Sequence, residues 1–196
     1  MQIRKKILES IINNWWVKSI KEEKQLWTNC EGFLVNFIKK WKRVRYFMKK
    51  TFVLWENKED LEKDYLLLKK YFKNIIPNTV FIEWKDKNIF SFSDPIIIDF
   101  DLLDIENEKF IKTLLQDENN YKIIKKIQFF IRKFELLIEE EWKILDLYWK
   151  ENLVFTKDWN IKYIDNFKVF YDKELIKKES FKKIEYLKNL IRDYVQ

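Results

Sequence analysis

The feature that most constrains this chain is its single glycine, Gly32, in 196 residues that include nine tryptophans. Glycine reaches positive φ angles without a steric penalty, so it is the usual residue in tight turns and after helices. Three tryptophans stand where glycine is favoured: Trp84 and Trp159 in turn-like segments, and Trp142 after the acidic end of a long helical pattern. Two explanations stay open. The first is an AT-biased genome that favours Lys, Ile, Asn and Phe, with the aromatic residues in the core. The second is that UGA codons, which some bacteria read as glycine, stand at these positions.

The absence of histidine and the single cysteine, Cys30, restrict the chemistry of the chain. They exclude Ser-His-Asp and Cys-His catalysis, zinc sites that need imidazole, and disulfides within the chain. Carboxylate, amine, hydroxyl and amide chemistry remains. A hydrophobic content of 47% over about one domain's length predicts a folded protein. No apolar run approaches the length of a membrane span, and we expect a cytoplasmic protein.

The first half of the chain has the pattern of a β-rich segment with one helix. Residues up to about Lys24 look like a charged, partly helical lead-in. Asn57 opens a helix whose apolar residues recur at helical spacing, and the segment around Pro77 ends it. Strand-like runs rich in β-branched and aromatic residues cover residues 32–38, 44–54, 79–83, 88–92 and 95–100.

The second half is mostly helical. A long helix is predicted over residues 121–140, with an apolar stripe of Ile124, Ile127, Ile131, Phe134 and Ile138. A short β pair follows over residues 153–156 and 160–164. A last helix over about 173–195 buries Ile184, Leu187, Ile191 and Tyr194. This order of elements predicts an α+β fold with two unequal lobes.

Residues 144–167 read ILDLYWKENLVFTKDWNIKYIDNF. This segment resembles the protein-kinase-like phosphotransferases, whose catalytic loop has the form D-L-x-x-x-N and precedes a metal-binding aspartate. On that resemblance Asp146 matches the catalytic aspartate, Asn152 the metal-binding asparagine and Asp165 the aspartate of the D-F-G element. The resemblance implies a phosphotransferase that uses ATP and Mg²⁺. Asp146 and Asn152 are six positions apart rather than five, so the loop carries an extra residue.

Oxygen-bearing side chains at these positions suit phosphoryl transfer. The reaction needs a held nucleophile and cations that neutralise the triphosphate, and Mg²⁺ prefers oxygen ligands. Asn152 and Asp165 at the two ends of one hairpin can converge on a metal, while Asp146 at the start of the loop faces the acceptor hydroxyl. We expect the three residues to meet in one cleft between the lobes. Each residue alone also fits an ordinary cap or turn role.

The first half carries weaker matches to the same family. The RYFMK run that ends at Lys49 resembles the strand with the ATP-contacting lysine, and Lys50 is a possible substitute. Gly32 lies where the glycine-rich loop would stand, and backbone amides near it would cover the phosphates. Glu62, with Glu59 as an alternative, is the candidate that orients the lysine. A solvated lysine on a strand is the ordinary interpretation.

The resemblance covers about residues 30–167, and too little chain follows for the helical subdomain on which protein kinases dock peptides. The sequence therefore looks like the small bacterial kinase-like proteins of the PhoP regulatory network family, or a trimmed relative of aminoglycoside and lipopolysaccharide sugar kinases. That implies one kinase-like domain over residues 1–196. Its small β-rich N-lobe would span about 25–100 and its truncated, mostly helical C-lobe about 101–196.

Two other functions remain open. A catalytically silent kinase-like module that binds nucleotide or a partner is favoured by the longer loop and the lone glycine. A basic nucleic-acid-binding protein is suggested by the net charge of +7 and the KKWKR run at 39–43. Acidic residues interleaved along the whole chain argue against nucleic acid. The phosphate acceptor and the oligomeric state stay open.

Overall fold

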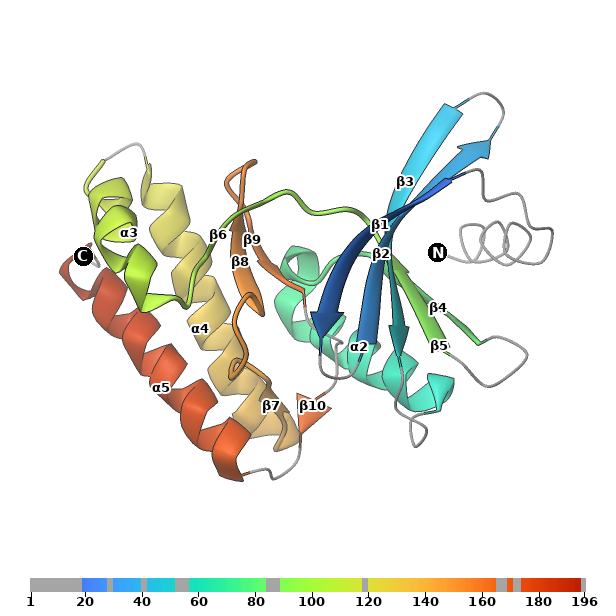
Figure 1. The fold of residues 1–196 in the computed structure, drawn as a ribbon. Helices are drawn as coiled ribbons and strands as arrows, with labels where there is room; N and C mark the ends of the chain where they lie inside the picture. The colour runs from blue at the N-terminus through green and yellow to red at the C-terminus, as the bar shows by residue number, and fades with distance from the viewer. Residues whose placement is uncertain are drawn as a thin grey trace. The chain divides into compact units, whose positions relative to one another are not determined.

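The computed structural model describes residues 19–27, 30–39, 42–51, 57–83, 89–117, 120–164, 169–170 and 174–194. These residues form helices and antiparallel sheets, which confirms the α+β prediction (Figure 1). The chain divides into two compact units. The first unit comprises residues 1–63 and 77–96, and the second comprises residues 64–76 and 97–196.

The first unit contains an antiparallel sheet with the strand order β1-β2-β3-β5-β4. The strands predicted at these places are confirmed: β2 (Cys30–Lys39), β3 (Lys42–Thr51), β4 (Thr79–Glu83) and β5 (Ile89–Ser93). The lead-in expected up to Lys24 is wrong from Ser19 onward, because β1 (Ser19–Trp27) is a strand. β1 pairs with β2 through an irregularity between Lys21 and Gln25. The pairing with β2, rather than the charged sequence of β1 itself, defines this strand.

The helix α2 (Lys58–Phe72) follows directly after Asn57, the residue that was predicted to open it. The Asn57 side-chain oxygen accepts the Asp60 backbone N–H at 2.8 Å, and the Asn57 amide donates to the Asp60 carboxylate at 2.7 Å. This reciprocal pair satisfies a backbone donor at the helix start. The predicted apolar face is buried: Leu61, Tyr65, Leu68 and Phe72. A short 3-10 helix, η1 (Lys73–Ile75), follows.

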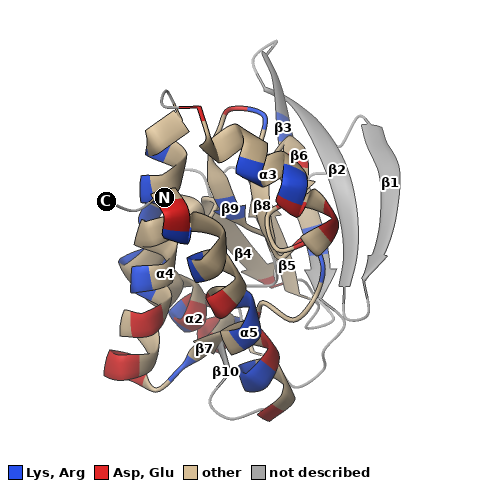
Figure 2. Ribbon diagram, turned by 90° about the vertical axis from the view of Figure 1, so that its left-hand side faces the viewer, with Lys and Arg blue, Asp and Glu red and all other residues tan. Residues whose placement is uncertain are grey.

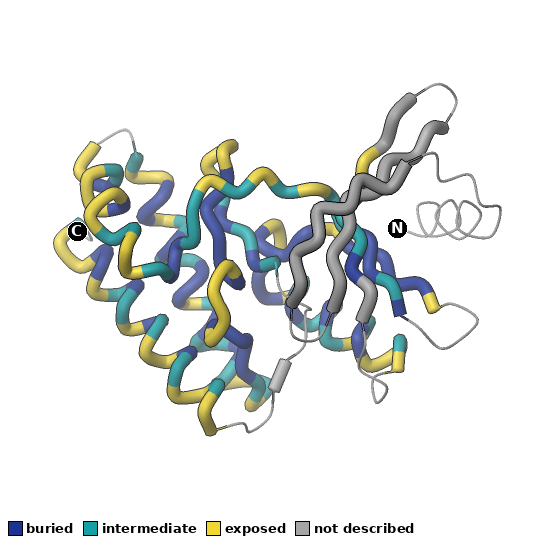
Figure 3. Tube along the Cα trace, viewed as in Figure 1, coloured by how far each residue is buried: buried dark blue, intermediate teal, exposed yellow. Residues whose placement is uncertain are grey.

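The second unit is built around α4 (Tyr121–Glu141) and α5 (Glu174–Ile191), which contact each other along their lengths (Figure 1). Their buried residues are dark in Figure 3, and charges of both signs are interspersed along them in Figure 2. The predicted α4 stripe is buried except at Ile138, which is half-buried. On α5, Ile184, Leu187 and Ile191 are buried as predicted. Tyr194 lies beyond the helix in η4 (Arg192–Tyr194) and is only half-buried, so its predicted burial is wrong.

Short elements complete the second unit. The β6 strand (Ile98–Asp101), β8 (Leu153–Thr156) and β9 (Ile161–Tyr163) form one antiparallel sheet, and β7 (Ile144–Leu145) pairs with β10 (Val169–Phe170). The predicted β pair is therefore confirmed. The helix α3 (Glu108–Leu115), preceded by η2 (Ile105–Asn107), was not predicted. None of the described helices combines the length and apolar composition needed to cross a bilayer.

Positive φ angles occur, among the described non-glycine residues, at Lys73, Trp142, Glu151 and Trp159. The expectation that Trp142 and Trp159 occupy positions that favour glycine is therefore confirmed. Trp84, the third tryptophan of that hypothesis, lies outside the described residues.

Candidate functional site

The loop between β7 and β8 in the second unit carries two of the predicted site residues, Asp146 and Asn152. Asp146 follows β7 directly and is 4% exposed, and Asn152 precedes β8 and is 6% exposed. Both are polar side chains withdrawn from solvent, while Tyr148 and Trp149 between them are exposed. The rings of these two aromatic residues meet edge to face, with centroids 4.8 Å apart. The loop thus buries its polar ends and exposes its aromatic middle.

Asp146 and Asn152 are in direct contact. The Asn152 side-chain amide donates to the backbone oxygen of Asp146 at 2.8 Å. The Asp146 carboxylate accepts the backbone N–H of Tyr148 at 2.8 Å, an Asx turn that starts the loop. The backbone oxygen of Asn152 accepts the N–H of Ile164 at 3.0 Å, which ties the loop to the end of β9. The structure therefore joins the predicted pair despite the extra residue.

A buried serine on α5 anchors the start of this loop. Ser180 is 0% exposed; its hydroxyl donates to the Leu145 oxygen and accepts the Leu147 N–H, both at 3.1 Å. The hydroxyl therefore bonds to two backbone groups of buried residues at the start of the loop. Sequence reasoning missed Ser180. The available signal was a small polar residue four positions before Ile184, in line with the apolar face of the helix.

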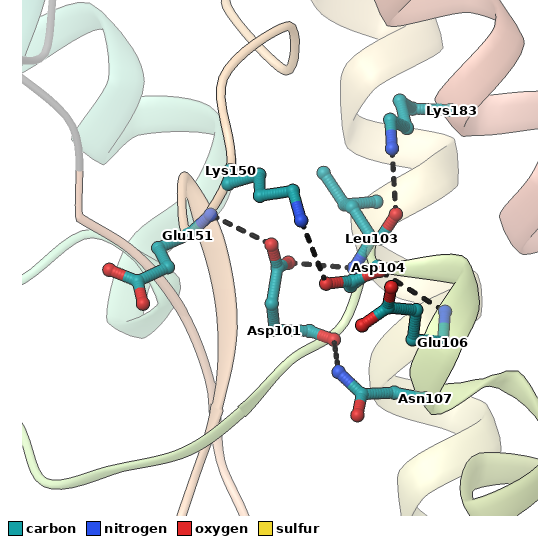
Figure 4. Close-up of polar contacts among 8 residues, drawn as sticks. All are labelled: Asp101, Leu103, Asp104, Glu106, Asn107, Lys150, Glu151 and Lys183. Carbon is teal, nitrogen blue, oxygen red and sulfur yellow. Dashed lines mark hydrogen bonds and ion pairs between the residues drawn. The ribbon is translucent and has the colours of Figure 1, made fainter.

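An aspartate at the end of β6 holds the other end of the loop (Figure 4). The Asp101 carboxylate accepts the backbone N–H of Glu151 at 2.8 Å through one oxygen and that of Leu103 at 2.8 Å through the other. Glu151 has a φ of 61°, a region that is unfavourable for residues with a Cβ. The Asp101 carboxylate therefore binds the backbone of Glu151, the strained residue of the loop. Sequence reasoning missed Asp101 because this contact joins segments 50 residues apart.

Further contacts stabilise the surroundings of Asp101 (Figure 4). Lys150 in the loop pairs with Asp104 at 3.5 Å, and Lys183 of α5 donates to the Leu103 oxygen at 2.7 Å. The backbone N–H of Glu106, then the charge of Lys150, lowers the pKa of the Asp104 carboxyl below its ordinary value. These bonds connect the loop, β6 and α5 within one unit.

The β8–β9 hairpin is held from α4. The Lys126 ammonium donates to the Trp159 backbone oxygen at 2.5 Å and to the Asn160 side-chain oxygen at 2.9 Å. Inside the turn, the Thr156 hydroxyl donates to Asp158 at 2.5 Å. This bond, followed by one from Asn160, lowers the pKa of the Asp158 carboxyl. The hairpin that follows the candidate loop is therefore fixed at its tip as well as at its base.

The remaining predicted residues lie in the first unit. Lys49 is 5% exposed on β3, where it stands opposite Gly32 of β2 and Ser91 of β5. Its ammonium lies 5.9 Å from the centroid of the Phe47 ring. Gly32 therefore lies within a strand that begins at Cys30, and residues 28–29 before it are outside the described part of the chain. A buried lysine opposite the only glycine remains the best lysine candidate.

The glutamate candidates lie on the first turns of α2. Glu62 pairs with Lys58 at 3.5 Å with its side chain 34% exposed, and Glu59 pairs with the same lysine at 3.8 Å with its side chain 66% exposed. The more buried Glu62 stays the preferred candidate.

Three further predictions fall on residues that the structure does not describe. Asp165, with its neighbours Asn166 and Phe167, lies outside the described residues. So do the side chains of Lys50 and of the basic run at 39–43. The expected meeting of Asp146, Asn152 and Asp165 in one cleft therefore stays a prediction. No family model matches the chain, and no curated protein matches it either.

Proposed function

We propose that this chain is a kinase-like phosphotransferase that transfers the terminal phosphoryl group of ATP, with Mg²⁺, to an acceptor hydroxyl. The observation that carries the proposal is the direct bond between the buried residues Asp146 and Asn152 at the entry of the β8–β9 hairpin. An aspartate and an asparagine in this order, before a short hairpin, are the residue types that phosphoryl transfer uses. In this proposal the two units are the two lobes of a kinase-like fold.

The chemistry of the loop fits a magnesium ligand at Asn152. Its amide nitrogen donates to the Asp146 backbone, so the atom it would offer to a cation is its side-chain oxygen. Oxygen is the donor that Mg²⁺ prefers, and we assign Asp165 as the second protein ligand. When bound, Mg²⁺ would neutralise charge on the triphosphate.

Asp146 is assigned as the group that orients the acceptor. One carboxylate oxygen is fixed by the Tyr148 N–H. That bond restrains the Asp146 side chain, and the carboxylate would receive the acceptor proton as the phosphoryl group is transferred. Lys49, which is buried on β3, is assigned as the lysine that would contact the nucleotide phosphates, and Glu62 as the residue that would orient it.

The proposal is tested with the full chain by ATP binding and turnover. We expect ATP with Mg²⁺ to raise the melting temperature. Asp165→Asn should weaken Mg²⁺-dependent ATP binding and turnover together. Asp146→Asn should leave ATP binding nearly intact and slow ATP hydrolysis or transfer by roughly 100-fold or more, the usual scale for loss of a general base. The matched control is Asp193→Asn, an exposed residue of η4, which should change neither.

The outcomes separate the proposal from its alternative. Binding of ATP with equal turnover in Asp146→Asn and the parent chain would favour a catalytically silent module. If ATP and Mg²⁺ neither stabilise the chain nor bind to it, the proposed function is wrong.

A further inference from the structure

Two tryptophans occupy backbone positions that favour glycine, and we propose that Trp142 and Trp159 are glycine in the protein made by its source cells, encoded by UGA codons. The inference does not depend on the proposed function. It rests on backbone geometry, side-chain exposure and composition.

Trp142 ends the α4 helix in the left-handed conformation. Its φ is 56° and its ψ is 29°, and its backbone N–H donates to the Ile138 oxygen at 3.1 Å. This is the geometry in which a helix commonly ends at glycine, because glycine has no Cβ to collide with the carbonyl that follows. The Trp142 side chain is 80% exposed. An indole this exposed gains little from packing that would offset the strained backbone.

Trp159 is likewise a left-handed residue, here in the turn of the β8–β9 hairpin. The Thr156 N–H donates to the Asn160 oxygen at 2.9 Å, which closes a loop of three residues, 157–159. The Trp159 N–H donates to the Thr156 oxygen at 2.8 Å, and its φ is 62°. Three-residue hairpins of this kind place a left-handed residue, favourably glycine, last in the loop. The Trp159 ring is about half exposed, with one edge-on contact to Phe155.

Among the residues that the structure describes, positive φ is concentrated at tryptophan. The backbone is described for four of the nine tryptophans, and two of these four have positive φ. All other described non-glycine residues contribute only Lys73 and Glu151. Positive φ is uncommon for any residue other than glycine and is a true outlier for a bulky one. Its concentration in the bulkiest residue type is therefore unexpected if these positions are tryptophan.

Composition points in the same direction. Average usage predicts roughly 14 glycines in a chain of this length. The sequence has one glycine and nine tryptophans. A code in which UGA specifies glycine, translated instead as tryptophan, would produce both the deficit and the excess.

The decisive experiment reads the two codons in the gene and the two residues in the protein. We expect UGA at positions 142 and 159 in genomic DNA. We also expect glycine masses in the peptides that cover both positions, measured on protein from the source cells. A UGG codon or a tryptophan mass at either position would overturn the proposal.

A second experiment tests the backbone argument on recombinant full-length chain. Trp142→Gly should melt higher than Trp142→Ala by roughly 2–4 °C, because only glycine relieves the positive φ while both variants remove the indole. Trp159→Gly and Trp159→Ala should show the same order. Trp27 in β1 is the matched control, since an extended backbone should make its glycine variant the less stable of the pair. An alanine variant equal to or more stable than glycine at position 142 or 159 would count against the proposal.

Discussion

Replacing Asp101 with alanine should release the candidate loop at Glu151. The carboxylate accepts two backbone N–H groups, each at 2.8 Å. A hydrogen bond to a charged group contributes about 1.5–3 kcal/mol, and a donor left unsatisfied in the interior costs about 1–3 kcal/mol. Asp101 is half-buried, so water can replace part of each bond. We therefore expect Asp101→Ala to reduce the free energy of unfolding by about 2–3 kcal/mol, which corresponds to a melting temperature lower by roughly 5–10 °C.

Hydrogen exchange tests the contact itself. The Glu151 amide donates to Asp101, so its exchange should accelerate in Asp101→Ala well beyond any change in the amides of α4. Asp101→Asn should lie between the parent and the alanine variant, because an amide keeps one acceptor oxygen. Asp99→Ala is the matched control on the same strand, where the side chain is exposed, and it should change little.

A second substitution tests whether Asp101 acts by stabilising the conformation of the loop or only by stabilising the whole fold. Glu151→Gly relieves the positive φ at this position by about 1–2 kcal/mol. On the proposed function, Asp101→Ala should also lower ATP turnover. Adding Glu151→Gly should restore much of that turnover, because the loop then needs less help to adopt its conformation. Unchanged Glu151 exchange in Asp101→Ala, or a double variant no more active than the single one, would refute this reasoning.

Three further predictions concern single side chains in the second unit. The Tyr186 hydroxyl is buried without a hydrogen-bond partner, so Tyr186→Phe should match or exceed the parent's free energy of unfolding, by up to about 1 kcal/mol in urea unfolding. Burial, followed by nearby carboxylates, raises the pKa of Tyr186 to about 12, so the parent should lose stability between pH 10 and 12 more steeply than this variant. Ser180→Ala should lower the free energy of unfolding by about 1–3 kcal/mol, measured in the same way, because it removes the bonds of the buried hydroxyl to the Leu145 oxygen and the Leu147 N–H. Asp158→Asn should flatten the loss of melting temperature on acidification. The lowered pKa of Asp158 contributes stability above pH 3.8 that disappears as pH falls through the folded-state value.

Local patterns predicted most of the helices and strands. The α2 helix was found because Asn57 and the apolar spacing after it specify the start and the buried face together. The hairpin was found because two short apolar runs flank a polar turn. Each of these patterns lies within a short stretch of the sequence, so it predicts the element without information about the rest of the fold.

The parts that sequence reasoning missed depend on partners distant in the chain. The strand β1 contains a run of charged residues and is defined by its pairing with β2. The helix α3 has only eight residues, too few for a clear periodicity. In the candidate site, Asp146 and Asn152 were predicted from the resemblance of their segment to the D-L-x-x-x-N catalytic loop of kinase-like proteins. Asp101 was not, because nothing in the sequence near it indicates the Glu151 amide.

The bond from Asp101 also stabilises a turn in the segment between Asp146 and Asn152. Within this segment the left-handed residue is Glu151, whose φ is 61°. With glycine absent from the loop, the conformation needs stabilisation from outside, and a charged hydrogen bond offsets about as much as a left-handed residue costs. A similar contact recurs at the positive-φ residue Lys73, whose backbone oxygen accepts the Lys69 ammonium at 3.2 Å. At these two turns, a charged side chain stabilises a backbone conformation that glycine adopts without a steric penalty.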